Sequence, residues 1–276
     1  MSTSTTSTRL SDPHAIPDRP EPRPFALVRH SLQLARRSLL KTMRTPEQLL
    51  DVTLQPMIFI AIFVYLLGGA IAGSTHDYLQ FLLPAIMVQT IMMSSTVTGT
   101  NLNTDIKKGV FDRFRSLPIA RSAPLIGSVL GDLIRFVVAI TVTLGFGYLI
   151  GFRIGTDPLQ LLAACLLVIV FGFCLSWVSV LIGMLVREPG AATGLGFLVM
   201  FPLTFGTNMM VPTDTLPGWL QAWVKINPAT HAMEAARALM LGTPDASGPV
   251  LKTLLWSAVL LVVFAPLAVS AYRRRT

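Results

Sequence analysis

Charged residues and cysteines are scarce in this sequence. Only 13% of its 276 residues are charged, whereas 52% are hydrophobic, and the mean hydropathy is +0.63. A chain of this size with so few charges has too little polar surface for a water-soluble fold. Its two cysteines, Cys165 and Cys174, lie nine residues apart in one apolar run, on opposite faces of a helix, which argues against a disulfide between them.

Motifs that carry chemistry are missing as well. The sequence has no G-x-x-x-x-G-K-[S/T] phosphate loop, no zinc-type H-E-x-x-H and no G-x-S-x-G nucleophile elbow. His76 and His231 are isolated histidines, so we expect neither to bind a metal. We therefore predict that the chain is not an enzyme and has no catalytic, cofactor-binding or metal-binding residues of its own.

The first 50 residues divide into two parts. Residues 1–24 are rich in Ser, Thr, Pro and charge and lack a secretory signal, so we predict a disordered, uncleaved cytoplasmic tail. Residues 25–50 place apolar side chains at three- and four-residue steps, which predicts an amphipathic helix on the inner leaflet; an ordinary surface helix is the alternative. Thr45-Pro46-Glu47-Gln48 predicts the start of a new helix.

Six apolar segments within residues 51–272 are long enough to cross a bilayer, which predicts an all-α integral membrane protein. They lie at about 52–72, 79–99, 124–152, 160–186, 190–211 and 250–271. Four glycine pairs spaced by four residues favour close helix packing or dimer contacts. These pairs are Gly69/Gly73, Gly127/Gly131, Gly147/Gly151 and Gly190/Gly194.

The basic residues are unevenly distributed between the connecting segments. Of the 22 Lys and Arg, 17 lie before the first span, in the second and fourth connections, or after the sixth span, including the basic tail at 273–276. The positive-inside rule then places both termini in the cytoplasm of a multi-pass plasma-membrane protein. Because this pattern accounts for the net charge of +8, we expect no nucleic-acid partner.

One opposite-charge pair lies within the third apolar segment. Asp132 and Arg135 are three residues apart and share a helical face. We expect a paired, partly hydrated couple at the inner membrane boundary, with a functional ion pair inside the membrane as the alternative.

The connection between the second and third spans, within 101–122, is basic and amphipathic. If it is helical, Ile106, Val110, Phe114 and Leu117 form an apolar ridge that ends before Pro118. Such a helix could dock on a partner, or it could lie flat on the membrane as a connector.

The loop at 213–242 carries helix signals on the opposite side of the membrane. Trp219 and Trp223 are one turn apart, as membrane-interface anchors are. Asn227 and Pro228 then begin a helix of about fourteen residues, too short to cross. We predict two half-helices that dip into the outer leaflet, with Glu234 and Arg237 paired; a flat outer cap is the alternative.

Together these two segments resemble those of the permease subunits of type 2 ATP-binding-cassette (ABC) exporters, most closely the daunorubicin-resistance kind. The likeness covers residues from about 25 to the end. The matching residues are Asp112-Arg113-Phe114-Arg115-Ser116-Leu117-Pro118 within the run from Gly109 to Arg121, and Leu216-Pro217-x-Trp219-Leu220 followed by Asn227, Pro228, Glu234, Arg237 and Gly242.

The resemblance implies a homodimer, or a pair of similar permeases, driven by cytoplasmic ATPase subunits that hold the ATP and Mg²⁺. It implies that a segment from Asp105 to Pro118 couples to the ATPase. The coupling residues would be Asp105, Lys107, Lys108, Gly109, Phe111, Asp112, Arg113, Phe114, Arg115, Leu117 and Pro118. The family often has Glu where this chain has Asp105 and Asp112, so the individual salt bridges stay unassigned.

An exporter of amphipathic small molecules such as drugs is the preferred hypothesis. Its spans offer apolar walls with scattered polar groups, which are Gln55, Gln89, Thr96, Thr207 and Asn208. The same walls would suit lipid or glycan-linked cargo. An ion-gradient transporter and a non-transporting scaffold are the alternatives of a different class, and a gradient-driven carrier would need Asp132, the one acidic group within the spans.

Overall fold

The structure, a computed structural model, describes residues 46–109, 123–243 and 245–275. The predicted cytoplasmic tail, most of the predicted amphipathic helix and the coupling residues from 110 to 122 lie outside this range. The described residues form helices and connections without a β-strand. The helices are α2 (Pro46–Ala72), α3 (Thr75–Lys107), α5 (Ala123–Leu149), α6 (Pro158–Leu185), α7 (Pro189–Phe205), the 3-10 turn η1 (Thr213–Thr215), α8 (Gly218–Ile226), α9 (Pro228–Leu241) and α10 (Ser247–Arg275).

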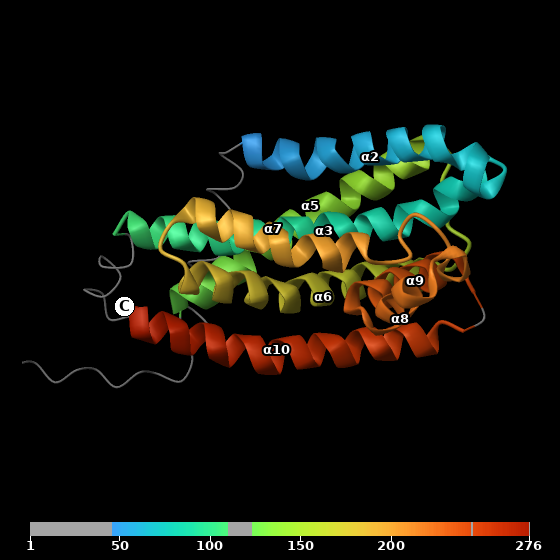
Figure 1. The fold of residues 1–276 in the computed structure, drawn as a ribbon. Coiled ribbons are helices and arrows are strands. Elements are labelled where there is room, and N and C mark those ends of the chain that lie inside the picture. Colours follow the sequence, from blue (N-terminus) through green and yellow to red (C-terminus); the bar gives the residue numbers. More distant parts are fainter. Residues whose placement is uncertain (1–45, 110–122, 244, 276) are drawn as a thin grey trace, which may run out of the picture.

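Six of these helices lie side by side and alternate in direction, while α8 and α9 pack together at one end of the bundle (Figure 1). We call this the α9 end. The first described residues of α2 and the last of α10 lie at the opposite end, which we call the C-terminal end. Helix α3 lies at the centre and packs against α2, α5, α6, α7 and α9. In the most apolar 18-residue stretch of α3, 72% of the residues are buried, whereas the corresponding share for α10, at the edge of the bundle, is 17%.

Five helices, α2, α3, α5, α6 and α10, are long and apolar enough to cross a membrane. The predicted start of a helix at Pro46 is also confirmed. The predicted fifth segment, 190–211, is shorter than expected because α7 ends at Phe205. Pro202 removes one backbone donor from the last turn, and Gly206 caps the helix by donating its N–H to the Pro202 carbonyl.

The outer helices keep large apolar side chains on their surface. Tyr65 and Leu66 on α2, Leu149 at the end of α5 and Val262 on α10 are each more than half exposed. Large exposed apolar side chains of this kind are unfavourable in water and suit lipid hydrocarbon. The fold is therefore a helical bundle whose outer surface matches a bilayer.

Among the described glycines, the closest approach to the backbone of another helix lies between α3 and α6, at glycines outside the predicted pairs; within those pairs, Gly147 packs tightly against the Leu83 side chain. A Cβ atom on Gly99 would lie 2.0 Å from the Ser179 carbonyl oxygen, and one on Gly183 would lie 2.3 Å from the Gly99 oxygen. By contrast, Gly190 and Gly194 have open space around the Cβ position. Small residues thus bring the central helix against α6 near the C-terminal end.

Candidate functional site

Arg237 of α9 ties three parts of the α9 end together. Its Nε donates to the Phe81 carbonyl of α3 at 2.8 Å, and its Nη2 donates to the carbonyls of Asn208 and Met209 at 2.9 and 3.1 Å. The guanidinium carbon lies 3.8 Å from the centre of the Phe81 ring. Arg237 is only 8% exposed, so these contacts satisfy a buried charge and the carbonyls of a segment that has no helical partners.

Glu234 and Arg237 do not form the ion pair that their spacing predicted; that prediction is wrong for the described structure. Asn208 lies between them: its Oδ1 accepts from Arg237 Nη1 at 3.2 Å, and its Nδ2 donates to Glu234 Oε1 at 2.8 Å. The free backbone carbonyls after α7 bind the guanidinium instead. The second carboxylate oxygen of Glu234 lies 3.8 Å from Nδ1 of His231.

Asn227 joins α8 and α9 to the end of α7. Its Oδ1 accepts from the Ala229 N–H at 2.9 Å, which confirms the predicted cap, and Pro228 takes the first helical position. Its Nδ2 also donates to the carbonyls of Leu203 and Gly206 at 2.9 and 2.8 Å. One side chain therefore caps the start of α9 and the end of α7.

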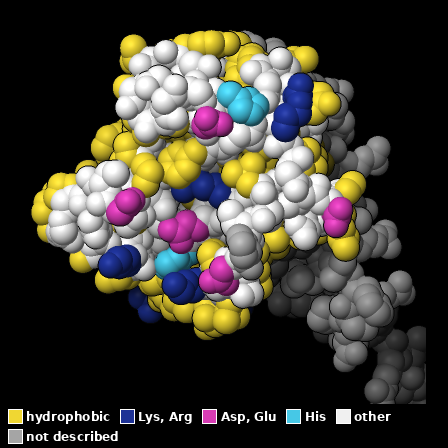
Figure 2. All heavy atoms as spheres, turned by 90° about the vertical axis from the view of Figure 1, so that its right-hand side faces the viewer, with side chains coloured by type: hydrophobic (Ala, Val, Ile, Leu, Met, Phe, Trp, Pro, Cys, Tyr) yellow, Lys and Arg dark blue, Asp and Glu magenta, His cyan; other side chains and the backbone are white. Residues whose placement is uncertain are grey.

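The predicted short helices at 213–242 are confirmed as α8 and α9. Trp219 is 76% exposed and Trp223 45% exposed, as membrane-interface anchors would be. Figure 2, which looks onto the α9 end, shows basic, acidic and histidine side chains among apolar ones. This face combines charged groups with an apolar surround.

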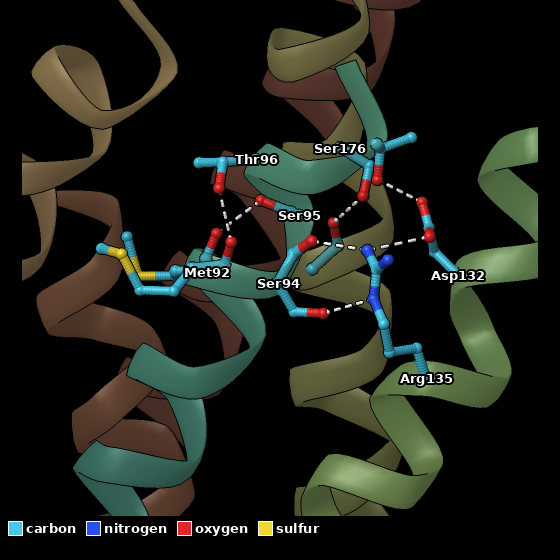
Figure 3. Close-up of polar contacts among 10 residues, drawn as sticks. Met92, Ser94, Ser95, Thr96, Asp132, Arg135 and Ser176 are labelled. Carbon is cyan, nitrogen blue, oxygen red and sulfur yellow. Dashed lines mark hydrogen bonds and ion pairs between the residues drawn. The ribbon is translucent and has the colours of Figure 1, made fainter. Parts of the chain in front are cut away.

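Asp132 and Arg135 form the predicted pair, but the pair is buried rather than partly hydrated. Arg135 Nη2 lies 2.9 Å from Asp132 Oδ1, and Arg135 is only 3% exposed (Figure 3). Helix α3 supplies the remaining partners, because Ser94 binds the guanidinium through Oγ and its carbonyl at 2.7 and 2.6 Å, and Thr98 donates to Asp132. The expectation of hydration is wrong because α3 covers this face of α5.

The predicted coupling residues that the structure describes lie at the C-terminal end. Asp105 and Lys107 belong to the last turn of α3, Lys108 caps the helix, and Gly109 has a φ of 65°. A left-handed glycine is a common helix terminator. Of the predicted apolar ridge, the structure describes Ile106, which belongs to α3 and packs on a cluster with Trp177 and Tyr272; its other members lie outside the described residues.

Sequence reasoning missed Asn103, Asn208 and Glu188 as organising residues. Asn103 donates to two backbone carbonyls at the end of α6, Asn208 binds the side chains of Glu234 and Arg237, and Glu188 binds Lys107 at 2.5 Å. The sequence gives only a weak signal for these residues, because the residues around an asparagine do not indicate which distant group its side chain will bind.

The model of the ABC-2 type transporter family matches residues 30–241. The chain belongs to this family. It is 46% identical over 239 residues to a daunorubicin resistance ABC transporter permease protein of Streptomyces coeruleorubidus, a match that covers 87% of this chain and 84% of the relative. It is 28% identical over 221 residues, 79% of each chain, to a probable doxorubicin resistance ABC transporter permease protein of Mycobacterium tuberculosis.

A more distant relative is a putative transport permease of Cyanophora paradoxa, 25% identical over 222 residues, with 78% of this chain and 75% of the relative covered. The chain is thus an ABC-2 permease homologous to drug-resistance permeases, and the resemblance read from its two motifs is confirmed at the level of the family.

Proposed function

We propose that this chain is the membrane-spanning subunit of an ABC exporter that moves amphipathic small molecules such as drugs out of the cell. The observation that carries the proposal is the 46% identity, over 87% of the chain, to a daunorubicin resistance permease. Apolar helices with a few buried polar groups, such as Gln89 and Thr207, are in keeping with cargo that is itself amphipathic. Lipid or glycan-linked cargo remains the alternative.

The proposed topology has six crossings, with α7 as the fifth. At about 1.5 Å per residue, its 17 residues reach about 26 Å, close to the thickness of the hydrocarbon core. The alternation of helix directions supports this count, because α2 begins and α10 ends at the same end of the bundle (Figure 1). The distribution of Lys and Arg supports a cytoplasmic C-terminal end and an α9 end that faces outward.

A separate ATPase would supply the energy, since the sequence carries no phosphate loop. The coupling segment from Asp105 to Pro118 begins at the C-terminal end, where a cytoplasmic subunit would reach it. A dimer of two permease chains completes the proposed complex.

Co-purification tests the ATPase partner. We expect the tagged permease to retain an ABC ATPase, and the double variant Phe114→Asp, Leu117→Asp to lose it, because charge replaces the apolar ridge. Asp245→Asn, an exposed substitution at the α9 end, is the control and should keep the ATPase bound. A wild-type chain that retains no ATPase would contradict the proposal.

Energy depletion separates the exporter from a gradient-driven carrier. We expect doxorubicin efflux from cells that express the chain with its ATPase to stop on ATP depletion and to continue when an uncoupler collapses the ion gradients. The reverse pattern would favour a gradient-driven carrier, and no efflux under either condition would favour a scaffold.

A further inference from the structure

The end of α3 is tied to the turn between α6 and α7 by three side chains that face the same way along α3. Thr100 Oγ1 lies 3.0 Å from Thr193 Oγ1 of α7, and Lys107 Nζ lies 2.5 Å from Glu188, the cap residue of α7. Between them, Asn103 donates its Nδ2 to the carbonyls of Gly183, in the last turn of α6, and of Val186, the residue that caps α6. We call these three contacts the α3–α7 strap.

Asn103 makes the buried part of the strap. Its Nδ2 lies 2.8 Å from the Gly183 oxygen and 2.7 Å from the Val186 oxygen, and the residue has no exposed surface. Carbonyls in the last turn of a helix lose their partners within that helix, so a donor from another helix can take that place. The contact between Gly99 and Gly183 holds the two backbones together one turn away.

Helix α7 continues the connection to the α9 end. It buries Ala192, Gly196, Met200 and Thr204, a four-residue repeat, and packs along α3. At its far end, Asn227 donates to the carbonyls of Leu203 and Gly206, in the same spacing of three residues that Asn103 uses at the end of α6. An asparagine amide therefore holds α7 at one end, and another holds the turn that leads into it.

We propose that Asn103 is a positioning residue that makes the end of α3 and the α6–α7 turn one rigid unit. Movement of the coupling segment that follows α3 then passes directly into α7, and through Asn227 to α8 and α9. This inference rests on the proposed function, in which an ATPase moves that segment.

An engineered disulfide that replaces the contact of Asn103, and that can be formed by oxidation and removed by reduction, tests this role. Asn103→Leu deletes the amide, and Thr100→Cys with Thr193→Cys places two thiols where the hydroxyl oxygens are 3.0 Å apart, so the two sulfurs need to approach by only about 1 Å to form an S–S bond. The native Cys165 and Cys174 are first replaced by alanine. Membrane vesicles that hold the permease and its co-purifying ATPase are then assayed for doxorubicin transport and ATP hydrolysis.

We expect Asn103→Leu to lower the doxorubicin transported per ATP hydrolysed by about tenfold, since two buried hydrogen bonds are lost. Oxidation of the triple variant Asn103→Leu, Thr100→Cys, Thr193→Cys should restore most of this ratio, and reduction should remove it again. The matched control is Asn101→Leu, on the same helix, whose side chain makes no hydrogen bond to another described residue; it should change the ratio less than about twofold.

The inference would be overturned if the oxidised and the reduced triple variant transported the same amount of doxorubicin per ATP hydrolysed. It would also be overturned if Asn103→Leu lowered transport and ATP hydrolysis by the same factor. Each single-cysteine variant shows whether a disulfide forms between two copies instead. If wild-type vesicles show no ATP-driven transport, the proposed function fails; if they transport and the disulfide has no effect, only the inference fails.

Discussion

The two ends of the bundle are held together by different means. At the α9 end, the buried guanidinium of Arg237 binds carbonyls of Phe81, Asn208 and Met209, which include a segment outside any helix. At the C-terminal end, regular helices already satisfy most of their own backbone, and the strap adds one amide, one hydroxyl pair and one exposed ion pair. The α9 end thus depends on its polar contacts for its shape, whereas the C-terminal end uses them to connect helices.

Removing Arg237 should have the largest effect on stability. Arg237→Met leaves several buried carbonyls without donors, so we expect the free energy of unfolding in detergent to fall by more than about 4 kcal/mol. Arg237→Lys keeps the charge but loses the forked geometry and should recover only part of this loss. A Met variant as stable as the wild type would break the contrast between the two ends.

The buried pair between the two ends should rank second. Asp132→Ala alone leaves Arg135 without its counter-charge, and we expect a loss of about 3 kcal/mol in the free energy of unfolding. The double variant Asp132→Leu, Arg135→Met removes both charges, so we expect it to lower the free energy of unfolding by less than Asp132→Ala does. Unfolding titrations of the wild type and the two variants measure this; a double variant less stable than the single one would show that the loss does not come from the unpaired charge of Arg135.

Backbone packing at the C-terminal end should rank third. Gly99→Ala places a methyl group against the Ser179 carbonyl, a backbone atom that no rotamer change can move, so we expect a loss of about 2 kcal/mol. Gly194→Ala, on α7, meets open space and is the matched control. Equal stability of the two variants would show that the α3–α6 contact is not tight.

The exposed ion pair of the strap should have the smallest effect on stability. The Lys107 and Glu188 side chains are 55% and 64% exposed, so solvent screens their attraction. We expect Glu188→Gln to change the free energy of unfolding by less than about 1 kcal/mol. A larger change, measured in the same titration, would show that the C-terminal end relies on polar contacts as much as the α9 end does.

Much of this architecture could be predicted from local patterns. Apolar length located the five long spans, and the Asn227-Pro228 pair located the start of α9, because both signals act within one helix. The partners of Arg237 could not be predicted. Its spacing from Glu234 favoured a direct pair, but the competing carbonyls come from Phe81 and Met209, far away along the chain.

The burial of the Asp132–Arg135 pair and the α3–α7 strap also depend on contacts between segments that are distant in the sequence. Asp132 and Arg135 were correctly paired, yet their hydration depended on α3, whose Ser94 and Thr98 cover them. Asn103 meets α6 because glycines allow the helices to approach, a contact that no periodicity in either helix encodes. Contacts between distant segments therefore require the structure.

Transport by inside-out membrane vesicles is the most direct test of ATP-driven drug export by this permease. Vesicles from cells that express the permease with its ATPase are supplied with doxorubicin and either ATP or no nucleotide, and vesicles without the permease serve as the control. An ATP-driven exporter should cause accumulation of doxorubicin only when ATP and the permease are both present. Accumulation that is the same without ATP, or without the permease, would contradict an ATP-driven exporter.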